Sequence, residues 1–375
     1  MAFRTRTQPS AVLVLDWPVV SSTSTIPLST STIFANLSGV RRRVSWNSLL
    51  LTIPSNPMKR QTSLRLRALF GAIVLMLGEQ QITNYHLSAQ DSMGPITVGK
   101  LVAILDDKAI NESSGLVLSH HNPNCFWTHN DSGDSARLFL VNSDGKSLAR
   151  VQIAKADAID WEDIAIHVAK DDAYLIIGDI GGNAKPRKHI TLYIVREPKL
   201  SAEAQKRGET MEFSVDIDIV MEVTFPGGVT NYESIAVDHS NHSILIVEKG
   251  NFAGRVYTVP LPPNPNNKQV IRVEAKQIGV APVPMATACD MSADGRSLVI
   301  ISYNIGFLFH REPNRAGKLE PWKSVLEREP VSFSLGKLRQ TEAVCFSKDE
   351  RSLIVTSEKV PTPLVEIELP INLRR

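Results

Sequence analysis

The chain has 375 residues, 43% of them hydrophobic and 21% charged, which is enough to bury a substantial core in one or two domains. Its net charge of +2 is unevenly divided, because residues 1–89 hold nine basic and two acidic side chains while the remainder holds 32 basic and 37 acidic ones. The larger part of the chain is thus mildly acidic, which argues against nucleic acid as a partner.

Residues 1–57 have the composition of a disordered leader. They are rich in Ser, Thr and Pro and lack a sustained hydrophobic period. Met58 stands where a shorter protein would begin. We interpret 1–57 as a disordered segment produced by a misassigned gene start, with Met58 as the true start.

Residues 58–89 resemble a secretory signal peptide. The basic stretch MKRQTSLRLR (58–67) precedes the apolar run ALFGAIVLMLG (68–78), and the small residue Ala89 follows. The apolar run is too short to span a bilayer comfortably, although a short membrane anchor is the alternative. We therefore expect an exported protein (periplasm, cell surface or secreted) whose folded domain covers 90–375.

From residue 90 onward, short apolar or alternating runs recur with turn residues between them, which indicates a repeat. Outside these runs, only SAEAQKR (Ser201–Arg207) indicates a helix. The runs NHSILIVE, GRSLVIIS and ERSLIVTS align without gaps, and the residue fifteen places before the end of each defines an anchor position. Two earlier repeats fit the same register with a two-residue insertion. The five anchors are Ser114, Glu162, Glu233, Thr287 and Glu342.

The repeat unit predicts a blade of a β-propeller. The positions two and four places after each anchor are apolar in all five repeats: Leu116/Leu118, Ile164/Ile166, Ile235/Val237, Cys289/Met291 and Val344/Phe346. Each unit supplies four short antiparallel strands; in the third these are ESIAVD, SILIVEK, RVYTVPL and QVIRVEAKQI. The absence of crossover helices excludes a parallel α/β fold.

Five anchors predict an all-β, five-bladed propeller, with a six-bladed ring containing one degenerate blade as the alternative. The last unit lacks a fourth strand, and ITVGKLVAIL (Ile96–Leu105) precedes the first unit without an assignment. We expect this N-terminal strand to complete the last blade and close the ring, because closure removes exposed strand edges.

The anchors predict a metal site. The first strand of each blade lines the central channel, so equivalent positions form a ring that reads Ser, Glu, Glu, Thr, Glu. Three converging carboxylates repel one another unless they are protonated or neutralised. A set of oxygen donors without His or Cys suits a hard cation, and Ca²⁺ accepts six to eight oxygens in flexible geometry. The alternative is a wet, polar channel without a metal.

The ring of anchors resembles that of the soluble calcium-activated nucleotidase (apyrase) family, a five-bladed propeller in which Ser, Glu, Glu, Ser and Glu hold calcium in the channel. The resemblance implies that Ser114, Glu162, Glu233 and Glu342 are calcium ligands, with Thr287 in place of the second serine. The repeats are equally similar to the SdiA-regulated family of exported bacterial propellers and, more loosely, to phytase-like esterase propellers. The likeness covers about residues 96–370 and rests on short motifs.

The loops between the second and third strands are expected at the same end of the channel as the ring. Three of them carry an acid, glycine and then an arginine: NDSGDSAR, DIGGNAKPR and EKGNFAGR. Guanidinium groups beside calcium suit a phosphate or carboxylate ligand, whereas Gly with Asn or Asp is also ordinary turn chemistry. The candidate ligand-binding residues are Asp131, Arg137, Asp179, Asn183, Arg187, Glu248, Arg255, Tyr303 and Glu358.

Two functions follow from these patterns. The first is an exported calcium-binding propeller, monomeric, with a site at the channel mouth for a small anionic ligand or a cell-surface partner. The second is a calcium-dependent phosphoester or phosphoanhydride hydrolase, which the apyrase resemblance implies and for which the catalytic residues are not identified. Three cysteines, Cys125, Cys289 and Cys345, cannot all pair and match no zinc pattern. We interpret them as small core residues.

Overall fold

The computed structural model describes residues 33–37, 40–44, 99–182, 186–207, 209–263 and 268–370. The chain divides into two units, Met1–Tyr85 and His86–Arg375. In the first unit, β1 (Ile33–Leu37) pairs antiparallel with β2 (Val40–Val44). The predicted signal peptide lies outside the described residues, and its assignment stays a prediction. Among the residues described, no helix is long and apolar enough to cross a membrane.

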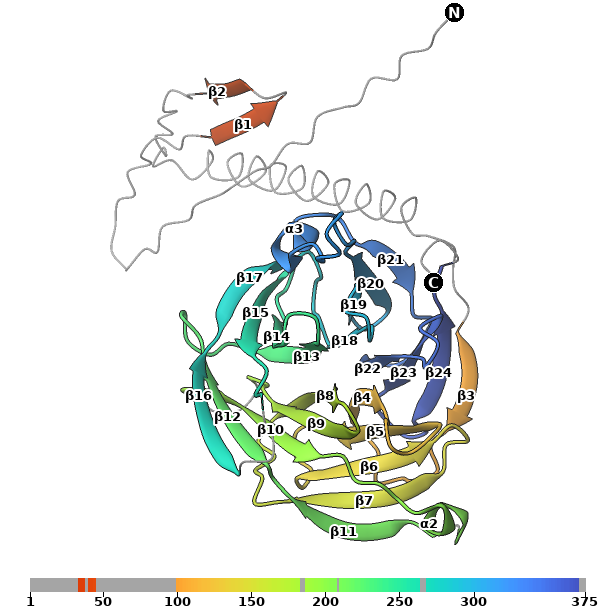
Figure 1. Ribbon diagram of the computed structural model, residues 1–375. Coiled ribbons are helices and arrows are strands. Elements are labelled where there is room, and N and C mark those ends of the chain that lie inside the picture. Colours follow the sequence, from red (N-terminus) through yellow and green to blue (C-terminus); the bar gives the residue numbers. More distant parts are fainter. Residues whose placement is uncertain are drawn as a thin grey trace, which may run out of the picture. The chain divides into compact units, whose positions relative to one another are not determined.

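The second unit consists of five sheets arranged around a central axis (Figure 1). In each sheet, four strands lie side by side in order from the axis outward, and neighbouring strands pair antiparallel. Blade 1 contains β4 (Ser113–Leu118), β5 (Cys125–Asn130), β6 (Arg137–Asn142) and β7 (Ser147–Ala154). Blade 2 contains β8 (Trp161–Ala169), β9 (Asp172–Asp179), β10 (Ile190–Arg196) and β12 (Ile219–Thr224).

The other three blades repeat this arrangement. Blade 3 contains β13 (Tyr232–Asp238), β14 (Ser243–Glu248), β15 (Gly254–Pro260) and β17 (Lys276–Ala281). Blade 4 contains β18 (Ala288–Met291), β19 (Ser297–Ile301), β20 (Ile305–His310) and β21 (Val331–Ser334). Blade 5 contains β22 (Thr341–Phe346), β23 (Ser352–Ser357), β24 (Pro363–Glu368) and β3 (Lys100–Ile104). The predicted five-bladed all-β propeller is confirmed.

The ring closes where the sequence predicts. Strand β3 pairs with β24, so a strand from before blade 1 completes blade 5. The core closes in the same place, because one cluster of buried residues joins Leu116 and Phe139 of blade 1 to Cys345 and Leu364 of blade 5. Four further clusters fill the four other blade interfaces. Each sheet thus buries both faces against its neighbours.

Two blades carry a fifth strand at the outer edge, which the sequence does not predict. Strand β11 (Met211–Asp216) runs parallel to β7, and β16 (Gln269–Glu274) runs parallel to β12. QVIRVEAKQI is therefore two strands and not the single fourth strand predicted for the third blade: its first half extends blade 2, and its second half, within β17, completes blade 3. The buried Ala275, which belongs to neither strand, divides them.

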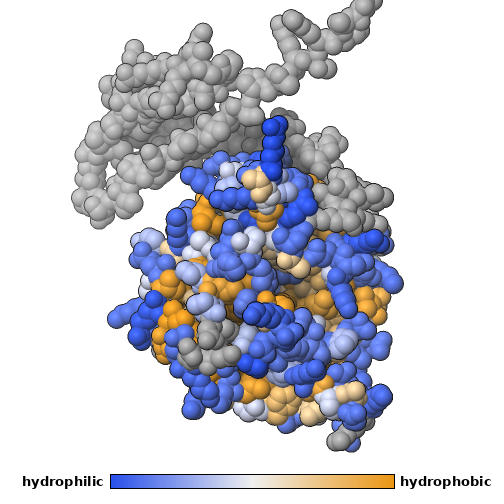
Figure 2. Space-filling view, in the orientation of Figure 1, coloured by the Kyte–Doolittle hydropathy of each residue, from blue (hydrophilic) through white to orange (hydrophobic). Residues whose placement is uncertain are grey.

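Two short helices complete the domain. The predicted helix is present as α2 (Ala202–Arg207), and α3 (Trp322–Leu326) packs its buried residues Trp322, Val325 and Leu326 against blades 3 and 4. Hydrophilic residues cover most of the face of the propeller in view, with apolar patches between them (Figure 2). All three cysteines are buried and free, as core residues would be.

Candidate functional site

The five anchors lie at one end of the innermost strands. Four of them are the second residue of β4, β8, β13 and β22, and the fifth immediately precedes β18. Their exposed fractions lie between 1% and 6%. The structure therefore brings the predicted ring to one end of the channel and buries it. The residues are Ser114, Glu162, Glu233, Thr287 and Glu342.

The three glutamates share a local feature that reorients their side chains. The register between the first and second strands skips one residue in each of their blades, and the skipped residue is Glu162, Glu233 or Glu342. Each glutamate is thus the extra residue of a β-bulge, a device that redirects a side chain and is frequent beside functional sites. The bulge explains how an acid can stand two places before a core residue without entering the core.

A repeated backbone contact brings each mouth loop onto its own blade. In four blades a residue that follows the second strand donates its N–H to the carbonyl of the residue two places before the anchor. These bonds are Asp131 to Glu112, Gly181 to Asp160, Lys249 to Asn231 and Glu358 to Gln340, with lengths of 2.9–3.2 Å. The loops predicted at the mouth of the ring therefore lie there.

Asp131 is the hub of a cluster of five carboxylates. Carboxylate oxygens of Asp131, Asp160 and Glu162 all lie within 4.8 Å of one another, and Asp160 and Glu162 belong to blade 2. Carboxylate oxygens of Asp131, Glu342 and Glu358 form a second such group, in which Glu342 and Glu358 belong to blade 5. Ligand oxygens on opposite sides of a calcium ion, with bonds of 2.3–2.6 Å, are about 5 Å apart. The spacing therefore fits a single ion at either group.

We name this cluster the carboxylate centre (Asp131, Asp160, Glu162, Glu342 and Glu358), and Glu162 is one of its almost fully buried members. Its side chain is 2% exposed, and Oε1 has no hydrogen-bond partner among the residues that the structure describes. Burial, and then the charges of Glu233 and Asp131, raise the pKa of Glu162 well above its usual value. A Cβ on Gly181 would overlap this Oε1, so glycine is required where the loop passes the carboxylate.

Two further pKa shifts in the centre have the same origin. Burial, reinforced by the charges of Asp160 and Glu233, raises the pKa of Asp131 to about 6. Burial and the neighbouring Glu358 raise the pKa of Glu342 to about 9. The centre thus holds protons at neutral pH in the absence of another cation, because the carboxylates cannot all ionise together.

Glu233 differs from the other two glutamates because the protein neutralises it directly. Lys249 donates to its Oε2 over 3.0 Å, and Asn231 donates to its Oε1 over 2.6 Å. The side chains of Lys249 and Glu233 are only 13% and 4% exposed. Lys249 Nζ also lies 5.4 Å from the centre of the Tyr303 ring. Burial opposes the charge on Lys249, but Glu233 prevails and raises its pKa.

The two hydroxyl anchors are engaged with neighbouring backbone. Ser114 Oγ donates to the carbonyl of Glu162 over 2.6 Å, and Thr287 Oγ1 donates to the carbonyl of Thr341 over 2.9 Å. Each bond joins one blade to the next. These hydroxyl groups therefore link neighbouring blades. Their hydrogens are engaged in these bonds, and only their oxygen lone pairs are left for a metal.

The mouth arginines are paired with acids of their own loops. Arg137 bonds to Asp134, Arg187 to Asp179 and Arg255 to Glu248, at 2.5–2.8 Å between the closest atoms. Asp179 is fully buried and also accepts from the N–H of Asp160, so this pair fixes the loop that carries Asp160. Asn183 lies outside the described residues.

Sequence reasoning did not single out two residues of this site. Asp160 stands two places before Glu162, where the other glutamate blades have Asn231 and Gln340, so a polar residue at that offset was a usable signal. Lys249 follows Glu248, and Lys359 follows Glu358, in equivalent loops. That repeated Glu–Lys pair was the second signal, but the sequence does not show that the Lys249 side chain contacts Glu233.

No protein-family model matches this chain, and no curated protein sequence matches it. Among solved structures, it is similar to a chain in a crystal structure of a nidogen/laminin complex, with 10% sequence identity and a TM-score of 0.36. That match covers 71% of this chain and 83% of the other. The resemblance to the nucleotidase and SdiA-regulated families stays an expectation from the residues.

Proposed function

We propose that this protein is a calcium-binding propeller whose ion is held by the carboxylate centre at one mouth of the channel. The observation that carries the proposal is the convergence of Asp160, Glu162, Glu342 and Glu358, from two blades, on Asp131 of a third. All donors are oxygens, which suits Ca²⁺ better than softer metals. The proposed set differs from the ring predicted from the sequence, which stays a prediction. It omits Glu233, which pairs with Lys249, and the hydroxyl anchors Ser114 and Thr287, which donate to backbone carbonyls.

The electrostatics of the centre support a divalent ion. Among the described residues, the five carboxylates of the centre and Glu233 lie near two largely buried cations: Lys249 at Glu233, and Arg187, which is 4.0 Å from Asp160 and pairs more closely with Asp179. The carboxylates thus outnumber the cations, and a buried charge without a partner is costly. A bound ion would favour the ionised forms and displace the protons that the centre otherwise holds. The Glu162 oxygen that lacks a protein partner would then become a ligand.

The site faces the mouth, which leaves room for a further ligand. Asp131 and Glu358 are partly exposed, whereas Glu162 is closed off beneath them. We propose that an anionic group of a small molecule, or of a partner at the cell surface, completes the coordination of the ion. The export that this role requires is supported by the signal-like segment 58–89 in the sequence.

Hydrolysis of phosphoesters receives no specific support from the mouth. The guanidinium groups expected to hold a phosphate, those of Arg137, Arg187 and Arg255, already pair with carboxylates. Binding of the ion is therefore the function that we propose.

The test is a calcium titration of the full chain after chelation, followed by calorimetry and thermal unfolding. At 100 times the dissociation constant, calcium should add about 2.7 kcal/mol to the free energy of unfolding, or about 5–10 °C in Tm. Repeating the titration in buffers of different ionisation enthalpy should reveal proton release. Elemental analysis beforehand excludes metal that survived the chelator.

The matched variants are Glu162→Gln and Glu222→Gln. Glu162→Gln should abolish the calcium increment while leaving the metal-free protein about as stable, because glutamine has nearly the shape of the protonated glutamate that the raised pKa of Glu162 favours without a metal. Glu222 lies on an outer strand of the same blade, paired with the exposed Arg272, and its variant should behave like the unaltered chain. An equal calcium response in all three proteins would overturn the proposal.

A further inference from the structure

The opposite end of the channel contains a cavity of about 620 Å³. Each innermost strand has its anchor near one end. The apolar residue four places after the anchor lies toward the other end of the strand. A strand rises about 3.3 Å per residue, so the two sets are about 13 Å apart. All five apolar residues of this second set line the cavity, one from each blade: Leu118, Ile166, Val237, Met291 and Phe346.

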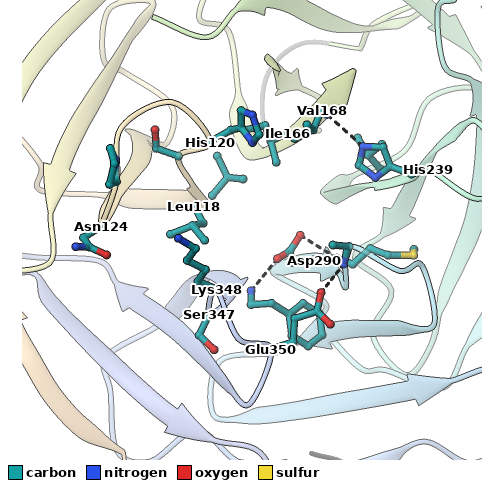
Figure 3. A pocket seen from close by; sticks show the side chains of 17 residues that line it. Leu118, His120, Asn124, Ile166, Val168, His239, Asp290, Ser347, Lys348 and Glu350 are labelled. Carbon is teal, nitrogen blue, oxygen red and sulfur yellow. Dashed lines mark hydrogen bonds between the residues drawn. The ribbon is translucent and has the colours of Figure 1, made fainter. Parts of the chain in front are cut away.

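The carboxyl group of Asp290 lies beside this apolar ring (Figure 3). Asp290 is partly exposed, and its two oxygens accept the N–H groups of Met291 and Phe346, each over 2.8 Å. A carboxylate offers about four lone-pair positions, so half of its accepting capacity remains. Burial raises the pKa of Asp290 to about 7, and the charge of Glu350 adds to this shift.

The other polar groups of the cavity leave it net negative. Glu350 adds a second carboxylate, which accepts the N–H of Ala293 over 2.6 Å. Lys348 also lines the cavity and is exposed to solvent, so the two carboxyl groups and this ammonium group give a formal charge of −1 when all three are ionised. His239 accepts the N–H of Val168 on Nε2 over 3.2 Å, and burial lowers its pKa, so its ring is neutral at pH 7. His120 is exposed.

The cavity is separated from the carboxylate centre by a polar crosslink. Asp163 is fully buried, and its carboxylate accepts the N–H groups of Ile235 in blade 3 and Cys289 in blade 4, over 2.9 and 3.3 Å. These contacts join three blades at the middle of the innermost strands. The cavity is thus a separate region of the molecule and does not depend on the proposed ion site.

We propose that this cavity is a second binding site, which takes a small organic cation consisting of an apolar body and a primary ammonium group. The five apolar residues would surround the body, and the ammonium group would donate to Asp290. Cavities of 300–1,000 Å³ with apolar walls and few polar groups are typical of small-molecule sites. The net negative lining selects a cation over an anion of the same shape.

The test uses three probes of nearly equal shape on the full chain: 1-naphthylmethylamine, 1-naphthylmethanol and 1-naphthoate, titrated by fluorescence and calorimetry. The amine should bind at least tenfold more tightly than the alcohol, and the carboxylate should bind least. Equal binding of the three probes, or binding of none, would overturn the proposal.

Variants locate the binding. Val237→Trp fills the cavity and should weaken amine binding at least tenfold, whereas Val270→Trp, at an exposed position of β16, should not change it. Asp290→Asn should remove the preference for the amine over the alcohol; if this variant does not fold, Val237→Trp and the three probes decide alone. Glu162→Gln should leave amine binding unchanged, so failure of this site and failure of the calcium site are distinguishable. Unchanged binding in Val237→Trp would contradict the assignment.

Discussion

Lys249 offers the sharpest test of the electrostatics of the channel mouth. Its ammonium group lies 3.0 Å from Glu233, and both side chains are largely buried. Lys249→Met keeps most of the side-chain volume but leaves Glu233 without its cation. The structure therefore predicts that the variant, free of calcium, is destabilised by the cost of an unmatched buried carboxylate.

The size of this loss has an upper limit set by protonation. Removing one partner of a buried ion pair typically costs about 3–5 kcal/mol. The variant can instead protonate the glutamate, and for an ordinary glutamate at pH 7 this costs about 3.7 kcal/mol, at 1.36 kcal/mol per pH unit. We expect a loss of about 3 kcal/mol, which corresponds to about 6–12 °C in Tm. The loss should shrink toward pH 4.5, where protonation is nearly free.

The assay is urea unfolding in chelator at pH 7 and pH 4.5, with a second ion pair as control. Lys268 lies 2.7 Å from Asp216, but both side chains are more than 60% exposed, so Lys268→Met should cost far less than Lys249→Met. Adding Glu233→Gln to Lys249→Met should recover most of the loss. Calcium should stabilise Lys249→Met more than it stabilises the unaltered chain. Equal, small losses in the two lysine variants would refute the reasoning.

Three further predictions concern the channel. The pKa values of Asp131 and Glu342 are raised to about 6 and about 9, so the folded protein holds these protons more tightly than the unfolded chain. The contribution of these two groups to stability in chelator is therefore fully present below about pH 4 and is lost as pH rises toward 9. Urea unfolding should show this loss, and saturating calcium should reduce it. Gly181→Ala should lower calcium affinity at least tenfold by calorimetry, since its Cβ would overlap two carboxylates, whereas Gly227→Ala, whose nearest neighbour is 3.7 Å away, should not change it. Asp163→Ala leaves two backbone N–H groups of neighbouring blades unpaired and should cost about 2–6 kcal/mol in urea unfolding; a loss below 1 kcal/mol would show that water replaces the carboxylate.

The number of blades was predictable because all five repeats have the same spacing between the anchor and the apolar residues that follow it. Five anchors with apolar residues two and four places later require five equivalent inner strands, and a missing fourth strand beside an unassigned N-terminal one implies closure. The fifth strands were not predictable from the same reasoning. β16 and β17 follow one another across Ala275 alone, so they read as a single run, and only the outer edge of blade 2 determines that β16 pairs there.

The site was predictable in position but not in membership. The register places Glu162 and Glu342 at one end of the channel, and the loop pattern places Asp131 and Glu358 beside them. It does not reveal that each glutamate occupies a bulge, because a bulge depends on the pairing of two strands. Nor does it reveal that Lys249 forms an ion pair with Glu233, whereas the carboxylates of the carboxylate centre hold protons in the absence of a metal.

The inner strands show why one register can support two chemically different ends. A residue near the start of each strand reaches the mouth where the loops after the second strands meet, so acids there can gather around an ion. The residue four places later reaches the opposite mouth, where apolar side chains from five blades face one another. Between them, strand N–H groups that face the channel need acceptors, and Asp163 and Asp290 supply these from neighbouring blades. Asp163 is fully buried among these N–H groups. Asp290 lines the cavity and is partly exposed, so lone pairs of its carboxylate are left for the proposed ligand.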